Sequence, residues 1–145
     1  MDVGIMSSVA AVVLSGNHLA RGAIPESLRF AETAYARSPR SPWTIGQLAA
    51  ALARSGQLER SNVLADQLRP GTAFGAPFGL ALVAIGAGDL DLAADWLEKA
   101  IEQRDIWVSF LLNVGNIGGR VMWSSPRWPG LAGLMNVSGR AQSSV

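Results

Sequence analysis

GAGDLDLAADWLEKAIEQR, residues 86–104, is the stretch of sequence that decides the fold. Gly88 is suited to end one apolar helix, and the side chain of Asp89 can cap the next helix. Apolar residues then recur at helical spacing along one face, at Leu90, Ala93, Ala94, Leu97, Ala100 and Ile101. A single helix cannot bury such a face by itself. The pattern therefore predicts helix pairs that stack on one another, an architecture that usually binds other molecules.

The turn that precedes this helix recurs twice upstream. Its glycines stand at positions 22, 56 and 88, which are 34 and 32 residues apart. Each is followed two places on by a hydrophobic residue and five places on by a small one, namely Ile24 and Ser27, Leu58 and Ser61, and Leu90 and Ala93. This period and pattern resemble the tetratricopeptide repeat (TPR).

The resemblance implies an all-α fold. Three degenerate TPR-like helical hairpins, at about 8–41, 42–73 and 74–107, would form a right-handed α-solenoid within residues 1–107. The remaining segment, 108–145, would supply capping helices and a tail, because the last repeat of a solenoid has an apolar flank that must be covered.

The end of the chain carries a second resemblance. WLEKAIEQRDIW, residues 96–107, and SSPRWPGLAGLM, residues 124–135, are similar to the C-terminal end of TPR modules that follow winged-helix or nucleotide-cyclase domains in bacterial regulators. Ile106 stands where those modules have a proline, and Trp128 where they have a phenylalanine. No winged-helix or cyclase sequence is present. The resemblance implies the sensor or docking part of a larger regulator, or a small relative of one.

Apolar spacing and turn residues predict the individual helices. Six are expected, at 3–20, 26–37, 43–54, 58–68, 75–87 and 90–104. Two more are expected at 106–114 and 126–137, with a loop at 115–119 between them. Glycines 71, 75 and 79 are expected to let the fifth helix pack closely on the fourth.

Composition excludes several classes of function. With 12 basic and 11 acidic residues the formal net charge is +1, so no broad basic field indicates a nucleic-acid partner. The chain has no cysteine, which excludes disulfides and thiolate chemistry and fits a reducing, cytoplasmic compartment. Residues 70–88 form a run of 19 uncharged residues, near the roughly 20 that a membrane helix needs. Since the run contains two prolines and five glycines, a buried helix and no membrane partner are expected.

Candidate chemical groups are few. His18, the only histidine, takes the place of an aromatic residue of the repeat and has no accompanying nucleophile motif. GNIGGR, residues 115–120, lacks the Lys-Ser/Thr ending of a phosphate loop. Four acidic residues share one face of the sixth helix and predict a solvated face with an Asp95–Lys99 pair; they are Asp91, Asp95, Glu98 and Glu102. We therefore expect no catalytic residue, no cofactor, no metal and no enzyme.

The sharper functional prediction concerns the groove that the first helices of TPR hairpins line. In this register its partner-binding residues are Val12, Leu19, Trp43, Arg54, Phe78, Leu82 and Ile85. Arg54 and Asn17 are the only polar candidates for gripping a carboxylate, so an apolar groove is expected. The leading interpretation is a non-enzymatic protein-protein interaction module that binds an apolar or amphipathic segment, or a second copy of the chain as a homodimer. The alternative is a regulatory domain that senses a small apolar ligand.

Overall fold

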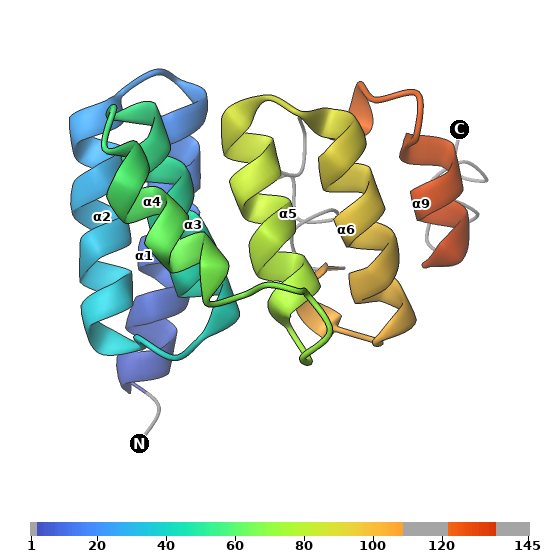
Figure 1. The fold of residues 1–145 in the computed structure, drawn as a ribbon, viewed down its shortest axis with the longest axis horizontal. Helices are drawn as coiled ribbons and strands as arrows, with labels where there is room; N and C mark the ends of the chain where they lie inside the picture. The colour runs from blue at the N-terminus through green and yellow to red at the C-terminus, as the bar shows by residue number, and fades with distance from the viewer. Residues whose placement is uncertain (1–2, 109–121, 136–145) are drawn as a thin grey trace.

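A computed structural model of the chain describes residues 3–108 and 122–135, and every regular element within these two ranges is helical (Figure 1). The all-α prediction is therefore confirmed for the described residues. The helices are α1 (Val3–Ala20), α2 (Ile24–Arg37), α3 (Pro42–Arg54), α4 (Leu58–Asp66), α5 (Ala76–Ala87), α6 (Leu90–Glu102) and α9 (Trp128–Leu134). Residues 106–108, at the start of the helix predicted over 106–114, are also helical. The rest of that helix and the loop predicted at 115–119 lie outside the described residues.

The six longer helices form three antiparallel pairs, which Figure 1 shows side by side, with α9 on the outer side of α6. α1 packs on α2, α3 on α4, and α5 on α6. The first pair contacts the second mainly through α2 and α3, and the second contacts the third mainly through α3 and α5. The result is a helical repeat-like architecture.

An equivalent hydrogen bond recurs inside the first two pairs. In the first pair the Ser27 hydroxyl donates to the carbonyl of Ser15 at 2.8 Å, and in the second the Ser61 hydroxyl donates to the carbonyl of Ala49 at 2.7 Å. Both bonds join residues 12 positions apart. Ala93, the small residue of the third turn, is fully buried. The small residue five places after each turn glycine therefore lets the two helices of a pair approach closely.

Local sequence explains where these helices begin and end. Asp89 caps α6, because its side chain accepts a hydrogen bond from the backbone N–H of Leu92 at 3.1 Å. Gly88 ends α5 in the left-handed region, with a φ of 80° that favours glycine. Pro42 opens α3 in its first turn, where the missing N–H would have no helical partner.

The crossing of α3 and α5 is unusually close. A Cβ placed on Gly46 would lie 2.2 Å from the carbonyl oxygen of Gly79. One placed on Gly86 would lie 2.6 Å from the Cβ of Ala50. The prediction that glycines 71, 75 and 79 pack the fifth helix on the fourth holds in part at Gly79, where a Cβ would lie 2.7 Å from the Leu68 side chain but also 2.4 Å from the carbonyl oxygen of Pro42 in α3. It is wrong for Gly71, which lies against Trp96 of α6, and for Gly75, which lies against Pro42. Because Gly46, Gly79 and Gly86 have no side chain, the backbones of α3 and α5 can lie this close together.

Burial explains the uncharged run at 70–88. α5, which occupies most of it, packs against α3 and α6, and most of its residues are buried. Within residues 3–108 and 122–135, no helix has both the length and the apolar character needed to cross a membrane.

The core consists of two clusters. The first joins α2, α3, α4 and α5, and its buried leucines are Leu48, Leu52, Leu64, Leu68 and Leu80. The second joins α5 and α6 to residues that follow them in the chain, and its larger buried members are Phe78, Leu82, Leu97, Val108, Met122 and Leu131. Residues after α6 thus complete the core of the third pair, as a capping segment is expected to do.

Candidate functional site

The structure places most of the predicted groove residues in the core. Leu19, Phe78 and Leu82 are each only 6% exposed. Phe78 and Leu82 belong to the second core cluster, and Trp43 and Ile85 are partly buried against it. A side chain this deeply buried offers almost no surface to a partner. The structure therefore gives these positions a packing role and not the partner-facing one expected from the repeat register.

The chain's own residues cover this region. The ring of Trp43 stacks on that of Trp107, with centroids 5.7 Å apart and an interplanar angle of 30°. Val108, Met122 and Leu131 pack in the same cluster as the α5 side chains. Residues that follow α6 therefore cover apolar side chains that the sequence-based prediction left for a partner protein.

The other predicted groove residues lie apart from this cluster. Leu19 of α1 lies beside Gly86 of α5. Arg54 is exposed, and its guanidinium donates a hydrogen bond to the carbonyl of Gly86 at 3.2 Å. Val12 is half-buried on α1. The seven predicted residues thus do not line one open groove among the described residues.

The ring of His18 packs against an aromatic side chain of α2. Its ring stacks on that of Phe30, with centroids 5.5 Å apart and an interplanar angle of 6°. The guanidinium carbon of Arg29 lies 5.1 Å from the centroid of the same phenylalanine ring. The His18–Phe30 stacking therefore joins the end of α1 to α2, whereas the Arg29–Phe30 contact lies within α2.

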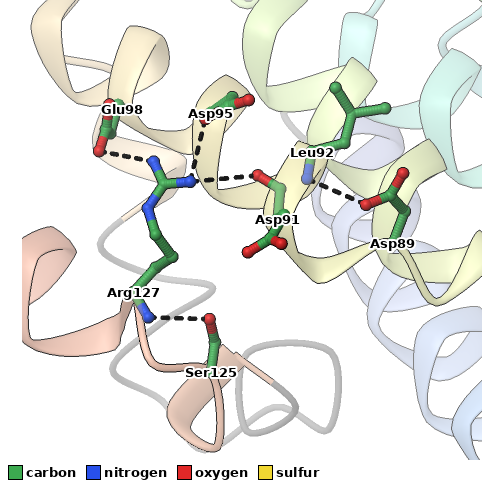
Figure 2. A network of polar contacts seen from close by, with 7 residues as sticks. All are labelled: Asp89, Asp91, Leu92, Asp95, Glu98, Ser125 and Arg127. Atoms are coloured by element: carbon green, nitrogen blue, oxygen red, sulfur yellow. Dashed lines mark hydrogen bonds and ion pairs between the residues drawn. The ribbon is translucent and has the colours of Figure 1, made fainter.

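The acidic face of α6 binds an arginine (Figure 2). Arg127, just before α9, donates to Asp95 at 3.0 Å and to Glu98 at 2.8 Å, and it also contacts the backbone carbonyl of Asp91 at 3.5 Å. Hydrogen bonds to Glu98 and to Asp95 raise the pKa of the Arg127 guanidinium. The predicted Asp95–Lys99 pair is thus replaced by an ion pair that ties α9 to α6. No cluster of metal-binding side chains occurs in the part of the chain that the structure describes.

One end of the molecule exposes large apolar side chains. The start of α5 and the end of α6 lie at the lower edge of the molecule in Figure 1, and α9 runs beside α6 toward the same edge. Phe74 precedes α5 and is 67% exposed, Ile106 follows α6 and is 75% exposed, and Leu134 closes α9 and is 57% exposed. We call these three residues the apolar end.

A glutamine amide holds part of the apolar end in place. Gln103, at the end of α6, donates to the carbonyls of Thr72 and Ala73 at 3.3 and 3.2 Å. Its side-chain oxygen accepts from the backbone N–H of Gly75 at 3.0 Å. These hydrogen bonds fix the segment that carries Phe74 to the end of α6, close to Ile106 in the chain.

A pocket of about 530 Å³ opens at this end, between the last turn of α6 and the last turn of α9. We call it the end pocket. Its lining residues are Ile101, Glu102, Arg104, Asp105, Ile106, Val108, Leu134 and Met135. Five of these eight are apolar, and three carry a charge.

Asp105 is the unusual member of this lining. It is only 5% exposed, and its Oδ1 accepts a hydrogen bond from the backbone N–H of Trp107 at 3.0 Å. Its other oxygen, Oδ2, accepts no hydrogen bond from the described residues and is accessible to water, since no buried side-chain oxygen or nitrogen in this part of the chain lacks a hydrogen-bond partner. Burial raises the pKa of the Asp105 carboxyl group, and the bond from Trp107 opposes this rise only in part.

The sequence predicts neither the apolar end nor the residues of the end pocket. It predicts a capping segment after Arg104 and, in the ligand-sensing alternative, an apolar ligand enclosed by the groove or by the tryptophan-rich end of the chain. The sequence feature that could have indicated the pocket is Asp105, an acidic residue directly before the apolar pair Ile106 and Trp107. Only the folded chain shows that Asp105 is buried.

Comparison with models of known protein families, with curated proteins and with solved structures finds no match to this chain.

Proposed function

We propose that this chain is a non-enzymatic protein-interaction module that binds an amphipathic segment of a partner protein at the apolar end. The observation that carries the proposal is the exposure of Phe74, Ile106 and Leu134, each more than half exposed, at the start of α5, after α6 and at the end of α9. Water-exposed apolar side chains gathered in one place are typical of interaction sites. TPR-like hairpins in a right-handed solenoid, as the sequence pattern implies, would present such an end to a partner.

Charge defines the kind of segment that fits. Glu102 and Asp105 line the end pocket, and the carboxylates of Asp91, Asp95 and Glu98 continue along the outer face of α6. Arg127 and Lys99 offset only part of this charge, and Arg104 lies at the pocket itself. A partner helix with apolar residues on one face and lysines beside them would complement this arrangement.

A pair of synthetic peptides tests the proposal. A labelled helical peptide with leucines on one face and lysines on the other is titrated with the protein and followed by fluorescence anisotropy. We expect saturable binding, and no binding of the matched peptide in which glutamates replace the lysines. Equal binding of both peptides would contradict the proposed charge preference.

Variants locate the binding surface. Ile106→Ser and Leu134→Ser should each weaken binding of the lysine peptide by about 5- to 100-fold, as interface anchors do. Val63→Ser serves as the control, because Val63 is 62% exposed but lies on α4. If the control weakens binding as much as the two end variants do, the peptide binds elsewhere.

A second copy of the chain is the alternative occupant of the apolar end. Light scattering after size exclusion, across a concentration series, measures the molar mass of the parent and of Ile106→Ser. A parent dimer that Ile106→Ser dissociates would assign the apolar end to self-association and replace the proposed partner segment.

The end pocket favours a second candidate function. A small-ligand-sensing regulatory domain, like the sensor part of the bacterial regulators that the C-terminal sequence resembles, needs a pocket with apolar walls and a few polar groups. The end pocket meets this description with five apolar and three charged lining residues. Ligand titration against the parent and against a pocket-filling Leu134→Trp variant tests it, since only the parent should bind.

A further inference from the structure

We propose that the end pocket binds a small amphiphile that carries an apolar chain and one primary amine. This inference rests on the second candidate function above and names the chemical class of its ligand. It depends on three features of the pocket, namely its size, its apolar walls and the buried carboxylate of Asp105.

Size and walls define the body of the ligand. The volume of about 530 Å³ lies within the roughly 300–1,000 Å³ of pockets that take small molecules. Ile101 and Val108 supply the wall on one side, and Leu134 and Met135 supply it on the other. These side chains offer dispersion contacts and no hydrogen bonds, so they favour an alkyl or aryl body.

Asp105 defines the polar group of the ligand. A buried carboxylate is costly unless hydrogen bonds or a cation compensate the loss of water. Asp105 is 5% exposed and accepts one hydrogen bond, from Trp107, while Oδ2 accepts none from the described residues and is the oxygen that water, or a ligand in its place, can reach. An ammonium group has three donors and a positive charge, and it would satisfy this oxygen.

The remaining charged groups of the pocket favour an amine over an acid. Glu102 adds a second carboxylate to the lining, and Arg104 adds one cation. A ligand carboxylate beside Asp105 and Glu102 would bring like charges together, which is unfavourable. An alcohol could donate a single hydrogen bond to Oδ2 but would leave the charge uncompensated.

Three probes of equal chain length test the inference. Octylamine, octan-1-ol and octanoate are titrated separately into the full chain by isothermal calorimetry at pH 7, below their aggregation concentrations. We expect octylamine to bind at least about 10-fold more tightly than octan-1-ol, as a charge-assisted hydrogen bond predicts, and octanoate to bind most weakly.

Asp105→Asn is the decisive variant. Asparagine keeps the shape of the side chain and the acceptor for the Trp107 N–H, but it removes the negative charge. The variant should bind octylamine and octan-1-ol with similar affinity. Leu58→Ala, on the exposed surface of α4, is the control and should keep the preference of the parent. Leu134→Trp, which fills the pocket, should abolish binding of both probes and provides a second test if Asp105→Asn does not fold.

Each outcome has a distinct meaning. Equal affinity of the parent for octylamine and octan-1-ol would overturn the proposed ligand class but keep a ligand-binding pocket. No binding of any probe would overturn both. An amine preference that survives Asp105→Asn, or binding that survives Leu134→Trp, would place the amine outside this pocket and overturn the inference. The protein-interaction function is independent of these results, because the peptide titration measures it separately.

Discussion

Replacing Gly46 by alanine tests whether the close crossing of α3 and α5 holds the second and third helix pairs together. The new Cβ would lie 2.2 Å from the carbonyl oxygen of Gly79, whereas Cβ atoms in proteins essentially never come closer than 3.0 Å to another heavy atom. The obstacle is helix backbone, which cannot rotate away as a side chain can. The two helices would therefore have to separate by about 0.8 Å at this point.

Dispersion energies give the size of the effect. A gap of 0.5–1 Å removes about a quarter to a half of the attraction of the atoms that face it. A buried side chain of leucine size makes about 40–60 contacts of roughly 0.1–0.2 kcal/mol, so the loss for one such residue is about 1–6 kcal/mol. Alanine recovers about 1 kcal/mol through its higher helix propensity, which leaves about 0–5 kcal/mol. Within this range we expect a net destabilisation of about 1–3 kcal/mol, the typical cost of an overpacked core.

Urea unfolding followed by circular dichroism measures this change. Gly133→Ala is the matched control, because Gly133 lies inside α9 and a Cβ there would meet nothing within 4 Å. It should leave stability unchanged or raise it by up to about 1 kcal/mol. If Gly46→Ala unfolds at the same urea concentration as the parent, the two helices do not cross as described and the account of this interface is refuted.

Three further predictions concern α6 and the segments around it. Leu97→Ala should lower the free energy of unfolding by about 2–5 kcal/mol, because Leu97 is fully buried, whereas Leu92→Ala, at a 44% exposed position, should change it by less than about 0.5 kcal/mol; urea titration compares them. Arg127→Gln should speed hydrogen exchange in α9 while the α3 amides keep their protection, and high salt should act on the parent in the same direction. Asp105→Asn should be more stable than the parent at pH 7, since burial raises the pKa of Asp105 in the folded chain and its charged form is disfavoured there. That gain in stability should disappear as the pH falls below the pKa of about 3.9 that an aspartate has in the unfolded chain. Unfolding measured at pH 7 and at pH 3 tests this, and an equal stability difference between variant and parent at both pH values would contradict it.

The proposals for the apolar end and the end pocket concern neighbouring surfaces, and Ile106 and Leu134 belong to both. A bound amphiphile would cover part of the surface offered to a partner segment. A competition experiment between octylamine and the lysine peptide therefore shows whether binding at one site prevents binding at the other, as the shared residues predict.

Most helix positions can be predicted from the amino-acid sequence. The apolar spacing predicts a helix over 3–20 and α1 spans Val3–Ala20, and Asp89 caps α6 as its position after a turn glycine predicts. These features depend on residues within one or two helical turns of each other. Spacing, capping groups and turn glycines act over that range, so they are readable from the chain alone.

Only the tertiary structure decided which apolar faces meet and which remain exposed. The partners in the Gly46–Gly79 crossing and in the Arg127–Asp95 ion pair lie about thirty residues apart in the chain. Apolar periodicity says that Phe78 and Leu82 need cover, but it cannot tell a partner protein from the chain's own Met122 and Leu131. The burial of Asp105 depends in the same way on neighbours that the fold brings together, because desolvation is a property of the assembled surroundings and not of local sequence.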